Sequence, residues 1–152
     1  MFDAPSGTAA RQAWLAILAK ATAFELTSYL RHAPELPDFT ILRSAETGMS
    51  MVRGRMGGGG QAFNFGEMTI SRCSIRDAGG RIGHGYAAGR DLAQVELIAR
   101  LDAALQDEAL RPAYQRAVLA PLREAQAARR AATEARAAAT EVKFFTLATM
   151  RS

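Results

Sequence analysis

Two side chains of this 152-residue sequence have the types and spacing for nucleophilic chemistry. The single cysteine, Cys73, lies in a strand-like run, and one of the two histidines, His84, lies in the next such run. If residues 77–80 close a symmetric hairpin, Cys73 lies directly opposite His84, within reach of a thiolate–imidazole pair. A register one residue away removes that pair, and a buried lone cysteine then behaves as a small apolar residue. The catalytic hypothesis therefore depends on the hairpin register.

The other polar residues form no recognisable catalytic or metal-binding set. In the symmetric register Arg76 faces Arg81, a like-charge pair that solvation or a nearby anion has to relieve. No spacing of His, Cys, Asp and Glu matches a metal site. Glu67 and Asp91 each lack a second acid in a comparable setting, so no acid–base pair is nominated. We expect no metal and no cofactor to be bound by this chain alone.

A glycine run preceded by arginines is a candidate anion or partner contact. Its residues are Arg53, Arg55, Gly57, Gly58, Gly59 and Gly60. A nucleotide-binding loop requires a helix directly after the glycines, whereas the residues from Gln61 to Phe65 have the pattern of another strand. Three interpretations remain: an anion nest of glycine N–H groups flanked by arginines, a contact with an acidic partner surface, and a solvated hairpin loop.

The elements that must position these residues form an antiparallel meander of about four strands. Glycine clusters separate runs rich in Val, Ile, Thr, Met and Phe, which is typical of strands joined by turns. The predicted strands are Phe39–Arg43, Gly48–Met56, Phe63–Arg76 and Arg81–Ala88. In the third, the apolar phase shifts after Ile70, which predicts either a bulge near Ser71 and Arg72 or burial on both faces.

Helices are predicted on both sides of the meander, which makes the fold class α+β. Apolar residues recur at helical spacing from Trp14 to Ala21, and Thr22 with Glu25 forms a capping-box signature that begins a second helix. Asp91 is placed to cap the helix after the meander, and Gln94 to complete a capping box there. An alanine-rich C-terminal helix is expected at about 121–141 and a loose N-terminus at about 1–7, within one domain spanning 1–152.

Composition and charge narrow the classes of protein. The hydrophobic content of 49% is enough for a packed core. There is no membrane-length apolar run and no leader pattern, and the single cysteine fits a reducing compartment, so we expect a cytoplasmic protein. The formal charge is +4, carried almost entirely by arginine, whose planar fork suits carboxylate and phosphate partners. These arginines are interleaved with acids and accompany no nucleic-acid-reading motif, so nucleic acid is not the expected partner.

Four segments carry a resemblance to a known family. They are GMSMVRGRMGG, FNFGEMTISR, GHGYAAGRD and KFFT, in this order along the chain. Together they resemble the PhnG family, the small subunit of the bacterial carbon–phosphorus lyase core complex, and the similarity extends from about Arg11 to Thr146. The chain departs from the family pattern in its four consecutive glycines before Gln61 and in its short tail after KFFT.

The resemblance implies an accessory subunit in organic phosphonate catabolism. Such a subunit supports, with homologues of PhnH, PhnI and PhnL, the formation of alpha-D-ribose 1-methylphosphonate 5-triphosphate from ATP and methylphosphonate, with release of adenine. A PhnJ homologue, which carries an iron–sulfur cluster and uses S-adenosylmethionine, then breaks the C–P bond. The family assigns no established catalytic residue to PhnG, so the resemblance implies a subunit of an enzyme that is not catalytic alone.

Two further features predict a partner interface. One face of the last predicted strand is nearly bare backbone at Gly83 and Gly85, which invites close approach by a ligand, a helix or a partner chain. Phe144, Phe145 and Leu147 follow a helix too alanine-rich to cover them. Apart from the resemblance, the alternatives are a stand-alone anion- or nucleic-acid-binding α+β module and a small enzyme dependent on Cys73 and His84.

Overall fold

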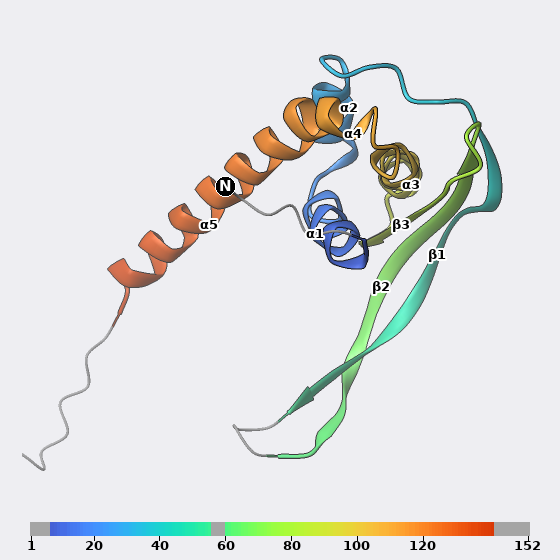
Figure 1. Cartoon of the computed structure of the whole chain (residues 1–152). Coiled ribbons are helices and arrows are strands. Elements are labelled where there is room, and N and C mark those ends of the chain that lie inside the picture. Colours follow the sequence, from blue (N-terminus) through green and yellow to red (C-terminus); the bar gives the residue numbers. More distant parts are fainter. Residues whose placement is uncertain (1–6, 56–59, 142–152) are drawn as a thin grey trace, which may run out of the picture.

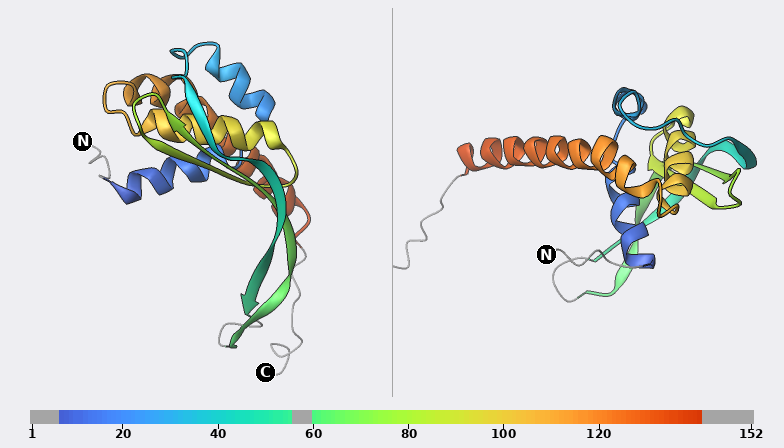
Figure 2. Two further views of the ribbon diagram at one scale, coloured as in Figure 1. Left: turned by 90° about the vertical axis from the view of Figure 1, so that its right-hand side faces the viewer. Right: turned by 45° about the horizontal axis from the view of Figure 1, so that its top comes forward.

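The computed structural model describes residues 7–55 and 60–141. One antiparallel sheet is covered by helices on a single face, and its other face is open in the left view of Figure 2. The elements are α1 (Thr8–Leu18), α2 (Ala23–Leu30), β1 (Phe39–Arg55), β2 (Ala62–Asp77), β3 (Ile82–Ala88), α3 (Leu92–Leu105), α4 (Arg111–Tyr114), a π-helical turn (Gln115–Leu119) and α5 (Ala120–Ala139). This arrangement confirms the α+β class.

The described sheet has three strands in the order β1-β2-β3, not the four expected. The two predicted strands before the glycine run are one strand, β1, which pairs with β2 from Phe39 to Arg55. Register shifts in β1 at Ile41/Arg43 and Arg43/Glu46 interrupt the ladder without ending it. The polar residues between Arg43 and Thr47 gave the signal of a turn, whereas they lie in a bulged and continuous strand.

The shift of apolar phase in β2 has a different origin from a bulge at Ser71 and Arg72. Residues 71, 73, 75 and 77 are buried in strict alternation beneath the helices. Met68 is 40% exposed on the opposite face, so β2 carries apolar side chains on both faces. The bulges at this level lie in the partner strand β1. Neither alternative is observed as predicted: Ser71 and Arg72 pair in continuous register, and β2 is buried on one face only, with Met68 exposed on the other.

Helices α1 to α3 build the core against the inner face of the sheet. The capping box at Thr22 forms as predicted, with Thr22 accepting from the backbone N–H of Glu25 and Glu25 accepting from that of Thr22. Asp91 caps α3, but the side chain of Gln94 donates to Ala21 instead of completing a box. The core includes Trp14, Ile75 and an unbroken run of buried residues on α3 from 101 to 105.

The chain after α3 forms one long helical path. Pro112 lies in the first turn of α4. Pro121 lies in the first turn of α5, directly after the π-helical turn. A proline has no N–H to donate to the preceding turn, and the rare π-helical turn lies directly before this one. Leu122 is the one buried residue of α5, and from residue 127 onward every described position is exposed, so α5 projects from the body in Figure 1.

Candidate interaction surface

The β2–β3 hairpin does not bring Cys73 opposite His84. The Cα partner of Cys73 is Gly85, and that of His84 is Ser74, one residue away from the symmetric register. Cys73 is buried under the helices, whereas His84 lies on the opposite face of the sheet. The same shift gives Arg76 the partner Ile82. The predicted Cys73–His84 pair and the predicted Arg76–Arg81 pair are therefore both wrong.

The surroundings of Cys73 oppose nucleophilic chemistry. Its side chain is 1% exposed and its thiol donates to the backbone oxygen of Arg43 at 3.4 Å. Burial raises the pKa of the Cys73 thiol, and the negative charge of Glu96 raises that pKa further. A reactive cysteine needs a lowered pKa and access to its substrate. Cys73 is a small core residue.

His84 makes a different polar contact, which the predicted symmetric register did not include. The Nδ1 atom of His84 lies 2.9 Å from the hydroxyl of Ser74 on the outer face of the sheet. A serine nucleophile needs a base that a third group orients, and among the described residues His84 has no hydrogen bond from its other ring nitrogen. The pair joins β2 to β3 as a cross-strand contact.

A buried aspartate joins α1, α3 and β3. Asp102 is fully buried and accepts from Arg11 at 3.1 and 2.7 Å, from the Trp14 indole at 2.9 Å and from the backbone N–H of His84 at 2.9 Å. Four donors satisfy both carboxylate oxygens, as a buried charge requires. Sequence reasoning missed this residue. The sequence pattern that could have revealed it is an acidic residue at a position of the apolar stripe of α3, seven residues after Val95.

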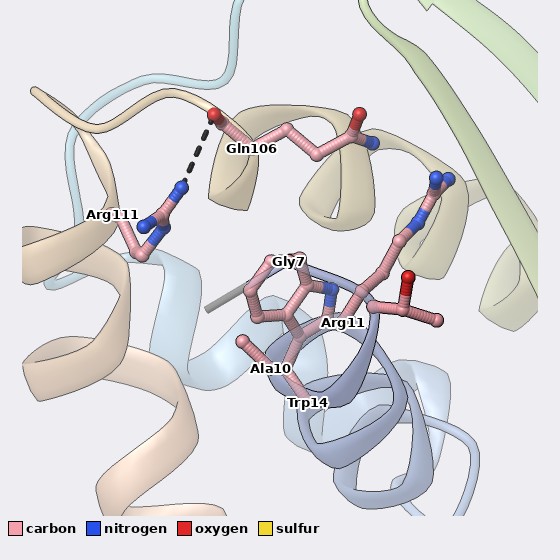
Figure 3. Close-up of a pocket in the computed structure, with 7 residues that line it drawn as sticks. Gly7, Ala10, Arg11, Trp14, Gln106 and Arg111 are labelled. Atoms are coloured by element: carbon pink, nitrogen blue, oxygen red, sulfur yellow. Dashed lines mark hydrogen bonds between the residues drawn. The ribbon is translucent and has the colours of Figure 1, made fainter. Parts of the chain in front are cut away.

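A hollow of about 390 Å³ adjoins this aspartate, and Figure 3 shows the residues that line it. Its two cations are already engaged within the chain. Arg11 binds Asp102 and also donates to the backbone oxygen of Ile82. Arg111 donates to the backbone oxygens of Leu105 and Gln106 and lies 5.8 Å from the centre of the Trp14 ring. These contacts tie the elements together; Arg11 is paired with the Asp102 carboxylate, whereas Arg111 is hydrogen-bonded to neutral backbone oxygens.

Gly83 and Gly85 are covered by the chain itself, so the prediction that they meet a partner is wrong. A Cβ at Gly83 would overlap the backbone oxygen of Ala99, and one at Gly85 would overlap that of Val95. Both glycines are buried. The bare face of β3 is therefore what allows α3 to pack directly against the sheet. Phe144, Phe145 and Leu147, which were predicted to meet a partner too, lie outside the described residues.

Five of the eleven large apolar side chains that are exposed in the described part of the chain lie on a two-stranded extension of the sheet. β3 pairs only with residues 70–76 of β2, so residues 49–55 and 62–69 continue as a pair without a third strand. We call these residues the distal ribbon; it projects beyond the helices in Figures 1 and 2. Five of its large apolar side chains are exposed, namely Met49, Met51, Phe63, Phe65 and Met68. Arg53 and Arg55 are exposed near its end.

The glycine run lies at the end of this ribbon. Gly57, Gly58 and Gly59 lie outside the described residues, and Gly60 is half-buried just before β2 begins. The anion-nest interpretation therefore stays a prediction. Within residues 7–55 and 60–141, no three of the His, Cys, Asp and Glu side chains are grouped so as to hold a metal ion. No helix in this part of the chain is long and apolar enough to cross a membrane.

Comparison with known proteins places this architecture in a family. Residues 9–150 match the family model described as phosphonate metabolism protein PhnG. The chain belongs to the PhnG family. It is 40% identical, over 124 residues, to the alpha-D-ribose 1-methylphosphonate 5-triphosphate synthase subunit PhnG of Rhizobium meliloti (strain 1021). That alignment covers 82% of this chain and 76% of the relative.

The segments that carry the PhnG resemblance map onto the sheet. GMSMVRGRMGG runs along the outer half of β1 into the glycine run, and FNFGEMTISR forms β2 from the distal ribbon to the body. GHGYAAGRD contains the glycine face of β3 and ends at the cap of α3. KFFT lies outside the described residues. In this PhnG-family chain, the two most exposed large apolar side chains of the sheet, Phe65 and Met49, belong to the first two of these segments.

Proposed function

We propose that this chain is a subunit of an alpha-D-ribose 1-methylphosphonate 5-triphosphate synthase that acts in organic phosphonate catabolism. Family membership and a 40% identical relative with that name support the proposal. The structural observation that carries it is the distal ribbon, where Met49 and Phe65 are 72% and 75% exposed. Exposed apolar groups that cluster in this way are typical of a surface that another protein covers.

In this proposal the chain does its work within an assembly. Its partners are homologues of PhnH, PhnI and PhnL for the synthase step, and of PhnJ for the later cleavage of the C–P bond. ATP is a substrate of the assembled synthase, while the iron–sulfur cluster and S-adenosylmethionine belong to the PhnJ homologue. The geometry of Cys73 and His84 supports this view over a stand-alone enzyme, because the two side chains lie on opposite faces of the sheet.

The experiment is reconstitution with adenine release as the readout. ATP and methylphosphonate are incubated with this chain alone, with homologues of PhnH, PhnI and PhnL alone, and with all four together, and adenine is separated by chromatography. We expect release only from the complete mixture. Robust release by the isolated chain would contradict an accessory role. Equal release by the partners with and without this chain would contradict its membership of the synthase.

A further inference from the structure

We infer that the distal ribbon, residues 49–55 and 62–69, is a docking arm that a partner subunit of the synthase encloses on both faces. The inference rests on the proposed function and adds to it the surface through which this chain joins the assembly. The occupant is a protein surface with an apolar channel and carboxylates at the end that receives Arg53 and Arg55.

The distal ribbon receives little support from the rest of the described chain. None of its residues is buried, and the pairing of β3 stops at Ile70. A two-stranded hairpin by itself is only marginally stable in water, because it lacks a covered face. The left view of Figure 2 shows the ribbon extending well past the helices. A partner that covers it supplies the missing packing.

The two faces of the ribbon carry different anchors. On one face lie Met49 and Met51, followed by Arg53 and Arg55 on alternate residues of β1. On the other face Phe63 pairs with Gly54, and its ring meets that of Phe65 edge to face, with centroids 6.4 Å apart. Apolar anchors on both faces indicate insertion into a channel instead of contact with a flat surface.

The two arginines at the end of the distal ribbon indicate the chemistry of the partner surface. Among the described residues, Arg53 and Arg55 make no ion pair. The described ribbon carries one acid, Glu67, which is opposite Met51 instead of either arginine. Arginine enclosed by a protein needs a carboxylate to balance it. A second copy of this chain, with its net charge of +4, complements the arm poorly, and two arginines are few for binding along a phosphate backbone.

The test compares two ribbon variants with matched controls. The apolar variant combines Met49→Ser, Met51→Ser and Phe65→Ser, and its control is Phe24→Ser, which changes an aromatic side chain that is 79% exposed on α2. The charge variant combines Arg53→Glu and Arg55→Glu, and its control is Arg116→Glu at another exposed position. All these side chains are exposed, so the variants should fold, which circular dichroism and a urea titration check.

Binding is measured between the full chain and the separately purified homologues of PhnH, PhnI and PhnL, the partners proposed for the synthase step. With one of them, we expect each ribbon variant to raise Kd by about 30-fold or more, because anchor residues at interfaces each contribute about 2 kcal/mol. The two controls should change Kd by less than about 3-fold, as expected for residues outside an interface. Hydrogen exchange at the amides of residues 49–55 and 62–69 should slow when that complex forms.

Five outcomes would overturn the inference. Unchanged Kd for both ribbon variants, or unchanged exchange in the ribbon of the complex, refutes the arm while leaving the proposed function intact. Loss of a homodimer in the ribbon variants shows that the occupant is a second copy. Loss of salt-dependent binding to a single-stranded RNA probe shows that it is nucleic acid. A wild-type chain that binds none of the subunits refutes the proposed function, and the docking arm with it.

Discussion

Replacing Asp102 by asparagine should destabilise this protein strongly, because every group that faces the carboxylate is a donor. One oxygen accepts from Arg11 Nε and Trp14 Nε1, and the other accepts from Arg11 Nη2 and the backbone N–H of His84. An asparagine side chain keeps one oxygen and presents an NH₂ group to the other two donors. In either orientation it leaves one buried donor, from Trp14 or His84, and one donor of Arg11 without an acceptor.

The expected loss follows from the burial of those donors. A buried donor left unsatisfied costs about 1–3 kcal/mol. The second donor belongs to Arg11, whose side chain is 33% exposed, so water replaces part of that contact and its share is smaller. We therefore expect Asp102→Asn to lower the free energy of unfolding by about 2–4 kcal/mol, a large part of the roughly 5–15 kcal/mol typical of a domain.

Urea unfolding followed by tryptophan fluorescence measures this loss, since the sole tryptophan, Trp14, is itself a donor to Asp102. The midpoint should fall by about 1–2 M for a urea m-value near 2 kcal/mol/M. Glu108→Gln, at an exposed position, is the matched control and should leave the midpoint unchanged. If Asp102→Asn unfolds at the wild-type midpoint with an unchanged m-value, the reasoning from four converging donors is wrong.

Three further predictions test the core and its edges. Gly83→Ala should lower the unfolding free energy by about 1–3 kcal/mol or more, because its Cβ overlaps α3, whereas Gly48→Ala, which has open space, should not; thermal unfolding distinguishes them. Cys73 should react with Ellman's reagent only after urea unfolds the chain, since its thiol is buried and its pKa is raised. Hydrogen bonds from the Arg129 side chain and then from the Thr22 cap lower the pKa of Glu25, so this stabilisation is present above the unfolded pKa of the carboxyl group and is lost as pH falls through the lower folded pKa. Arg129→Ala should therefore lower the urea midpoint more at about pH 7 than at about pH 3, and an equal loss at both would contradict the assignment.

Local patterns predicted the elements of this chain better than their pairing. The capping box at Thr22, the cap at Asp91 and the alanine-rich helix depend on residues close in sequence, and all three are present. The hairpin register is fixed at Asp77 and Arg81, where each residue donates its backbone N–H to the other. Asp77 donates its backbone N–H to Arg81, and the Asp77 carboxylate accepts from the N–H of Arg81, so the loop between them has three residues. A loop with an odd number of residues shifts every cross-strand pair by one residue from the symmetric register.

The loop also explains which residues the sequence could not place. Gly80 adopts a φ of 82°, which a glycine accepts without strain and which completes the three-residue loop. Nothing in the letters Ala78-Gly79-Gly80 decides between that loop and a symmetric one. The symmetric register therefore paired Cys73 with His84, and the actual partner of His84, Ser74, was overlooked. The Asp102 cluster was missed for a related reason, because its donors come from α1 and β3, which are 88 and 18 residues away from it along the chain.

The buried residues that hold the fold and the surface proposed for docking lie in different parts of this molecule. The buried residues lie on the helices and on the inner half of the sheet, and the distal ribbon and the outer turns of α5 add none. Changes in those two projections alter few contacts that hold the fold, because a side chain that is mostly exposed in the native state loses little when it is replaced. The exposed Met, Phe and Arg side chains of the ribbon therefore contribute little to folding. If they contribute free energy, they do so when a second surface removes them from water.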